Sequence, residues 1–176
     1  MIAGETSLYT WNQQAYDFYR NYVEVLTLPN ELNSGEIRTL CERIGENHRL
    51  EATLYETAAL MTTANCVKLT SGKCDHNRKQ KIIITDRVGN HFSVYTNCNH
   101  CYNKIYNYLP TSLHDSAWML KEDGIKRYRL DFTVENEKET KAVLQTFLNL
   151  FSSENWKQKV SYDGTFTRGH IKRGVE

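Results

Sequence analysis

Hydrophobic positions recur at helical spacing in some segments and at every second residue in others. This pattern predicts helices and strands that follow one another along the chain. Four segments carry apolar residues at helical spacing, and most of them have a capping residue or a glycine at an end. The expected helices cover residues 12–22, 34–45 and 111–124, and a last helix carries the apolar positions of 143–151.

Short runs rich in β-branched and aromatic residues predict the strands. They cover residues 7–11, 23–28, 50–55 and 127–133. The last run alternates, with aromatic and aliphatic side chains on one side and charged side chains on the other. Such alternation is typical of a strand with one buried face.

A long segment, roughly residues 57–110, interrupts this order between the third strand and the third helix. It holds one hairpin signal, in which residues 82–85 and 92–95 flank a turn around residues 88–90. We therefore expect a single α/β domain over residues 1–176, with a cysteine-containing β-hairpin as an insertion within it.

The predicted order amounts to four βα units, which implies a parallel sheet with helices outside it. Eight such units close a barrel, so four resemble half of a (β/α)8 barrel. Half a barrel leaves two sheet edges bare, which is a liability for an isolated chain. We therefore expect pairing with another half, either the remainder of a full-length barrel or a second copy in a homo-oligomer. An open four-stranded α/β sandwich is the alternative fold.

The composition is that of an ordinary globular protein. The chain has 176 residues, 40% hydrophobic and 24% charged, with a mean hydropathy of −0.62. No apolar run approaches the roughly 20 residues that a membrane-spanning helix needs. The first residues lack the basic start and apolar core of a signal peptide, so we expect a cytoplasmic protein with no membrane partner. The net charge of +1 creates no overall field that favours nucleic acid.

Four of the five cysteines lie in the insertion, in a chain where a disulfide framework is not expected. Seven residues separate Cys66 from Cys74, and Cys98 and Cys101 form a C-x2-C pair. Such a pair places two sulfurs on one tight turn, and four thiolates suit zinc or an iron–sulfur cluster. The polar neighbours of these cysteines argue against the alternative of unrelated buried thiols. Cys41 lies on an apolar helical stripe, where core packing is the better interpretation.

Histidines are the other candidate metal ligands, since imidazole can replace a thiolate. The residues concerned are His76, His91, His100 and His114.

Basic and aromatic residues also gather in the insertion. The basic residues are Lys68, Lys73, Arg78, Lys79 and Lys81. The tyrosines that follow are Tyr95, Tyr102, Tyr106 and Tyr108. Basic groups neutralise phosphates and aromatic rings stack on unpaired bases, so this pattern favours RNA as a partner. The alternative is a solvated loop with tyrosines that pack over the sheet.

The C-terminal tail is a second candidate binding segment. Arg168, His170 and Arg173 lie there among regularly spaced glycines, and Lys73 and Arg78 of the insertion complete the candidate ligand-binding set. Arginine can hold a carboxylate or phosphate through two hydrogen bonds. The alternative is a frayed terminus without a role.

Several segments of the chain resemble the collagenase-like peptidase U-32 family. They are residues 61–66, 70–74, 85–89, 101–107, 128–133 and 166–176. The similarity runs from about residue 8 to residue 176, and its closing segment is the most specific part. The chain is similar only to the C-terminal portion of the long family members, whose N-terminal portion would contain a complete barrel.

The resemblance implies two kinds of activity. The family is named for the degradation of protein or collagen, which implies a hydrolase with a protein or peptide substrate and no assigned catalytic residues. Related members take part in hydroxylating RNA bases or quinone precursors and hold a four-iron cluster on cysteines of comparable layout. The segment 71–74 resembles their second ligand segment, so the resemblance favours a 4Fe-4S cluster on the four cysteines, with zinc as the alternative.

Three functions therefore stay open. A peptidase lacks support from local motifs, because no H-E-x-x-H or G-x-S-x-G occurs and a four-cysteine metal site leaves no water to attack a peptide. RNA binding or modification would use the basic and aromatic residues of the insertion. A non-catalytic structural module would dock on the rest of a larger enzyme.

Overall fold

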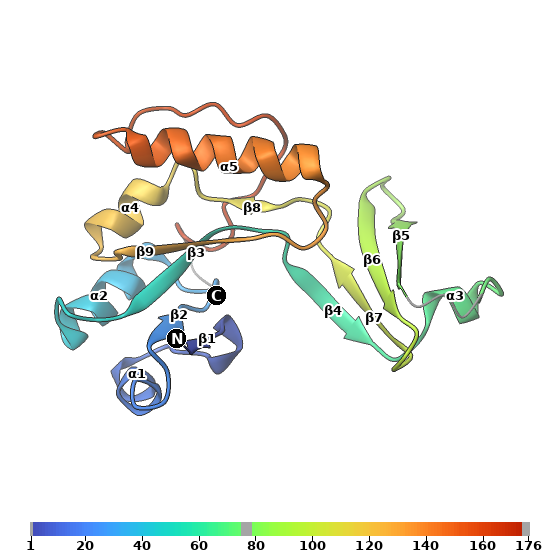
Figure 1. Cartoon of the computed structure of the whole chain (residues 1–176), viewed down its shortest axis with the longest axis horizontal. Coiled ribbons are helices and arrows are strands. Elements are labelled where there is room, and N and C mark those ends of the chain that lie inside the picture. The colour runs from blue at the N-terminus through green and yellow to red at the C-terminus, as the bar shows by residue number, and fades with distance from the viewer. Residues whose placement is uncertain (1, 75–78, 174–176) are drawn as a thin grey trace. The chain divides into compact units, whose positions relative to one another are not determined.

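A computed structural model describes residues 2–74 and 79–173 (Figure 1). Its internal contacts divide the chain into two compact units. Unit 1 comprises Met1–Glu56 and Thr111–Glu176, and unit 2 comprises Thr57–Pro110. The described residues form two sheets and five α-helices, which makes the chain a mixed α/β protein, as the sequence predicts.

The sheet of unit 1 is mainly parallel. Its strands lie in the order β1 (Ala3–Gly4), β2 (Val25–Thr27), β3 (Leu50–Glu56) and β9 (Arg127–Asp131), and each neighbouring pair is parallel. The short strand β8 (Thr111–Ser112) pairs antiparallel with the end of β3. Sequential parallel neighbours need a crossover between them, and helices supply it here.

Three helices connect these strands, and a fourth follows the last of them. α1 (Gln13–Tyr19) joins β1 to β2, α2 (Ser34–Ile44) joins β2 to β3, and α5 (Glu137–Ser152) follows β9. α4 (Ala117–Glu122) precedes β9, after the excursion through unit 2.

Capping residues fix where the main helices begin. The side chain of Asn33 accepts from the backbone N–H of Glu36, whose carboxylate in turn accepts from the backbone N–H of Asn33. Asn136 and Glu139 repeat this capping box at α5. Each box satisfies two backbone donors that a helix start would otherwise leave open.

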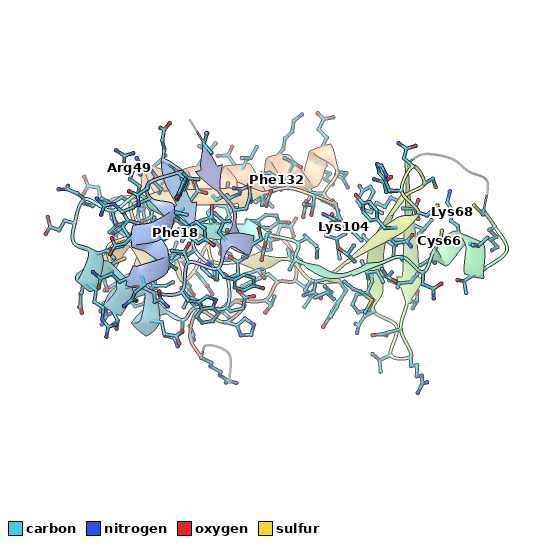
Figure 2. The ribbon with its side chains drawn as sticks, turned by 90° about the horizontal axis from the view of Figure 1, so that it is seen from below. Phe18, Arg49, Cys66, Lys68, Lys104 and Phe132 are labelled. Carbon is cyan, nitrogen blue, oxygen red and sulfur yellow. The ribbon has the colours of Figure 1, made fainter. Side chains whose placement is uncertain are left out.

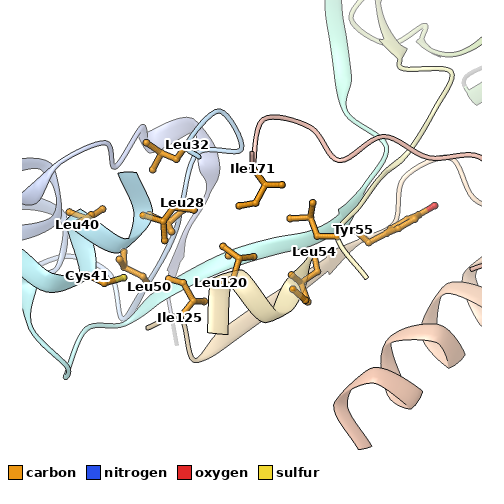
Figure 3. Close-up of a cluster of buried hydrophobic side chains, with 14 of the residues drawn as sticks. Leu28, Leu32, Leu40, Cys41, Leu50, Leu54, Tyr55, Leu120, Ile125 and Ile171 are labelled. Atoms are coloured by element: carbon orange, nitrogen blue, oxygen red, sulfur yellow. The ribbon is translucent and has the colours of Figure 1, made fainter. Parts of the chain in front are cut away.

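One hydrophobic core holds unit 1 together (Figure 3). Apolar side chains of β2 and β3 belong to it, and α2, α4 and α5 contribute their apolar stripes. Its most buried members include Leu26, Leu50, Leu54, Leu120 and Phe147. Cys41 is buried in the same cluster, which confirms its core role, and this burial raises the pKa of its thiol to about 11.

Unit 2 contains a four-stranded antiparallel sheet in the order β4 (Ala59–Thr63), β7 (Tyr102–Tyr106), β6 (His91–Asn97) and β5 (Lys79–Thr85). A short helix, α3 (Val67–Thr70), follows β4. Strands β5 and β6 form the hairpin that the sequence predicts. The expected turn is there too, with Gly89 at a φ of 92°.

Two element predictions are wrong, the first because of local backbone geometry and the second because of strand pairing. Residues 7–11 are not a strand, because Thr6–Leu8 forms a 3-10 turn and Tyr9 then adopts a left-handed φ of 49°. The predicted helix start at Thr111 is also wrong, since Thr111 and Ser112 pair with β3 and α4 begins only at Ala117. Tertiary pairing overrides local propensity at this second site.

The helices of the chain have ordinary lengths. None of those formed by residues 2–74 and 79–173 combines the length and apolar character that crossing a membrane requires.

Candidate functional site

The charges of the chain are distributed unequally between the two units. Unit 2 has seven lysines and arginines against two acidic residues, whereas unit 1 has fifteen against nineteen. The formal charges are therefore +5 and −4. A net charge near zero for the whole chain conceals a basic unit that favours polyanions.

One face of the sheet in unit 2 gathers tyrosines and lysines from three adjacent strands. Tyr95 of β6 lies opposite Lys104 of β7 on one side and Lys81 of β5 on the other. Paired residues of an antiparallel ladder share a face, and so do residues two apart on one strand. Tyr102 and Tyr106 therefore lie on the same face as Lys104. We name these five residues the tyrosine–lysine face.

Side-chain contacts hold the tyrosine–lysine face in place. The rings of Tyr95 and Tyr106 meet edge to face, with their centroids 5.9 Å apart. The amide of Asn97 donates to the hydroxyl of Tyr102 at 3.1 Å. Lys81 and Lys104 are exposed, and the three tyrosines are half-buried, so parts of their rings remain open to a ligand. Figure 2 shows Lys104 on this sheet.

The opposite face of the same sheet is closed. Val94, Thr96 and Asn103 lie there, each at most 4% exposed. Tyr108 belongs to this side, because its ring packs against that of Phe92 at 5.4 Å. The structure therefore brings three of the four sequence-predicted tyrosines together and separates the fourth from them.

The four cysteines of unit 2 lie at one end of its sheet. Cys66 follows the end of β4 and immediately precedes α3 (Figure 2). Cys74 comes after α3 in the chain. Cys98 and Cys101 lie in the turn between β6 and β7. The end of β4, the end of β6 and the start of β7 are adjacent in the antiparallel register, because Thr63 pairs with Asn103 and Asn97 pairs with Tyr102.

Hydrogen bonds connect the two cysteine segments. The side-chain amide of Asn103 donates to the backbone carbonyl of Asn65 at 3.0 Å, next to Cys66. In the turn, the thiol of Cys101 lies 3.9 Å from the carbonyl of Cys98, and Cys101 has a left-handed φ of 49°. A left-handed conformation is uncommon for a residue other than glycine, asparagine or aspartate.

No metal ligand group is assembled in the described part of the chain. Among residues 2–74 and 79–173, no three or more histidine, cysteine, aspartate or glutamate side chains are arranged to hold a metal ion. The metal site on Cys66, Cys74, Cys98 and Cys101 stays a prediction. Of the candidate histidines, His91 and His100 lie in unit 2, His114 lies in unit 1, and His76 is outside the described residues.

The other candidate ligand-binding residues are scattered. Lys73 is exposed in unit 2, and Arg78 lies outside the described residues. Arg168 makes a two-pronged ion pair with Asp115 of its own unit, with Nε 2.9 Å from Oδ2. His170 and Arg173 are exposed and close a backbone turn, in which the N–H of Arg173 donates to the carbonyl of His170 at 3.0 Å.

Unit 1 also has a charged network, on the sheet face that points away from its core. Arg129 lies 3.1 Å from Glu5 and 3.8 Å from both Glu51 and Asp131. The hydroxyl of Thr27 donates to Glu51 at 3.0 Å. These are the charged positions that alternate with apolar ones in the sequence, but only strand order brings Glu5 to Arg129.

Glu56 closes the carboxyl end of β3 beside this network. Burial raises its pKa, and the nearby charge of Asp131 raises it further. The amide of Asn30 acts in the opposite direction by donating to Glu56 at 2.6 Å.

No family model, curated protein or solved structure matches this chain. The similarity to the U-32 family thus stays a prediction that rests on the segments that resemble it.

Proposed function

We propose that unit 2 binds single-stranded RNA on the tyrosine–lysine face. The observation that carries this proposal is the placement of three tyrosines and two lysines on one accessible sheet face of a unit with a formal charge of +5. Sheets that present aromatic rings between basic side chains are a recurring way to bind unpaired bases.

Each residue type on this face suits one part of a nucleotide. A tyrosine ring offers a flat surface on which a base stacks, and this interaction accepts any base. Lys81 and Lys104 flank Tyr95, where they would neutralise the phosphates on either side of a stacked base. Stacking on ring faces needs unpaired bases, so single strands are favoured over duplexes.

The acidic residues of unit 2 offer little opposition to a polyanion. Asp86 accepts from the backbone N–H groups of Val88 and Asn90 at 2.9 Å, so its carboxylate is engaged in the β5–β6 turn. The other, Asp75, is outside the described residues.

Binding of a fluorescent single-stranded oligonucleotide at increasing salt tests this proposal. We expect the logarithm of the association constant to fall linearly with the logarithm of the salt concentration, and Lys104→Ala to reduce the slope by about 0.7. The matched control is Lys138→Ala, which removes an exposed lysine of α5 in unit 1 and should leave the slope unchanged. Absence of binding at low salt, or an equal effect of both variants, would contradict the proposal.

A metal centre on Cys66, Cys74, Cys98 and Cys101 is the second proposed feature of unit 2. It is favoured by the location of all four thiols at one end of the sheet and by the hydrogen bond that links the Asn65–Cys66 segment to β7. Four thiolates are the donor set of structural zinc and of 4Fe-4S clusters. The metal would supply a crosslink in the first case and an electron-transfer centre in the second. Anaerobic purification with quantification of iron, sulfide and zinc distinguishes them.

For unit 1 we propose half of a (β/α)8 barrel, in a chain that resembles the C-terminal part of a U-32 family protein. The order β1-β2-β3-β9, parallel and with a helix before each next strand, supports this proposal. Its partner would be the remainder of a barrel or a second copy of the chain. Sedimentation of the chain alone, and mixed with the N-terminal portion of a long family member, tests both alternatives.

The geometry gives little support to the peptidase activity that the resemblance implies. The hydroxyl of Ser112 and Nδ1 of His114 are 2.9 Å apart, as a nucleophile and its base would be. However, Ser112 is 0% and His114 is 4% exposed, so a peptide does not reach them in this conformation. Gelatin cleavage that is lost in Ser112→Ala would reverse this assessment.

A further inference from the structure

The buried pair of Ser112 and His114 is covered by a segment from near the C-terminus. The ring of His114 stacks on Tyr162, with centroids 4.9 Å apart, and meets the edge of Phe166 at 4.6 Å. The backbone of Thr167 accepts from the N–H of Ser112 at 2.9 Å. We name residues 162–168 the C-terminal strap.

The strap is also held at its far end by charge. Arg168 forms its two-pronged ion pair with Asp115, the residue next to His114. Although burial raises the pKa of Asp115, the guanidinium of Arg168 and the hydroxyl of Ser116 lower it below its ordinary value. The carboxylate closest to His114 therefore already has a positive partner.

We infer that His114 makes the strap a pH-sensitive latch, which is closed while the imidazole is neutral and opens when the imidazole gains a proton. A neutral imidazole is suited to its position between two aromatic rings. An imidazolium there loses water, and the nearest carboxylate is already neutralised. Opening would expose the Ser112–His114 pair and the edge of β8 that does not pair with β3.

The charges around His114 set the direction of the effect. Burial lowers the pKa of His114; Asp115 raises it and Arg168 lowers it. Tyr162, whose ring stacks on that of His114, is also titratable, and burial raises its pKa, so it stays neutral at physiological pH.

The sign of the pH dependence follows from this lowered pKa. The released strap exposes an imidazole of ordinary pKa, near 6.5, which binds a proton more readily than the docked form. Docking is therefore unaffected by pH well above that value and weakens as the pH falls below it. Each unit of difference between the two pKa values changes the docking equilibrium about tenfold.

Hydrogen exchange on the full chain, corrected for the intrinsic effect of pH, tests the latch. Between about pH 7.5 and about pH 5.5, we expect the protection of the amides of Ser112 and the strap to fall about tenfold, while α5 stays protected. In His114→Gln the side chain cannot become charged in this range, and the strap should behave alike at both pH values. Pronounced pH dependence that persists in His114→Gln would overturn the latch.

A titration of the unmodified chain keeps the test independent of how the variant folds. The ring signals of His114 and the strap amides, followed by NMR, should change with the same midpoint, below the ordinary imidazole value of about 6.5. Titration of His114 without any change in the strap would overturn the inference. Arg168→Ala serves as the control, because it removes the ion pair and should weaken docking at both pH values.

Discussion

The two units differ in how they are held together. Unit 1 has a cluster of nineteen buried hydrophobic residues drawn from both of its chain segments. In the described part of unit 2, Val94 is the one buried hydrophobic residue, and the sheet depends on its ladders and on polar contacts such as that of Asn103 with Asn65. An antiparallel sheet with so little core is marginal alone, so unit 2 has most to gain from a bound metal or ligand.

The largest expected effect is in the core of unit 1. Phe147→Ala removes a ring that is 0% exposed, and we expect it to lower the free energy of unfolding by about 3–5 kcal/mol. Leu148→Ala, next to it on α5 but 56% exposed, should cost much less. Urea denaturation followed by circular dichroism measures both. Equal losses would mean that the described core is not what stabilises unit 1.

The second prediction concerns the proposed metal centre. Cys98→Ser should remove the bound metal, which we expect at about one zinc or four irons per chain, and reduce the exchange protection of β6 and β7. Protection of α5 should not change. The control, Cys41→Ala, alters the core of unit 1 and should leave the metal content intact. A chain purified without metal, with both units fully protected, would refute a structural centre.

The third prediction concerns the tyrosine–lysine face. Tyr106→Ala should weaken the binding of single-stranded RNA by about 1–3 kcal/mol, because a base loses its stacking surface. Tyr22→Ala removes a tyrosine of unit 1 that is 65% exposed and should have no effect on affinity. Fluorescence anisotropy at constant salt measures both. If the two variants bind alike, the face is not the binding site.

The smallest expected effect is on a helix start. Asn136→Ala breaks the capping box of α5, and we expect a loss of about 1 kcal/mol in the free energy of unfolding. Gln145→Ala, an exposed position in the middle of the same helix, is the control, since alanine has the higher helix propensity. A cap variant as stable as the control would show that α5 depends on packing alone.

The sequence predicts the elements that carry strong local signals. Asn12 caps α1 and Gly45 ends α2 as expected, and the alternation of residues 127–133 corresponds to β9, with Tyr128 and Leu130 against the core. Local patterns suffice there because caps and one-sided burial act within a few residues.

Other elements have no local signal. β1 is only two residues long, and four of the five side chains of β4 are exposed, so no alternation marks either strand. Both strands form because their backbones pair with a neighbouring strand, β1 with β2 and β4 with β7. The same limit applies to the candidate site. Composition predicts tyrosines and lysines in the insertion, but only the register shows that Lys104 joins Tyr95 while Tyr108 is excluded.

The pairing of β8 with β3 makes the second unit separable in principle. Tyr55 is paired with Ser112 and Glu56 with Thr111, so the chain leaves and re-enters unit 1 at two adjacent backbone positions. The residues of unit 2 therefore take the place of the turn that would join β3 to β8 in a simple hairpin. A tight turn in its place would close the gap without disturbing the parallel strands. Evolution or a protein engineer could thus exchange the basic sheet for another loop and keep the scaffold.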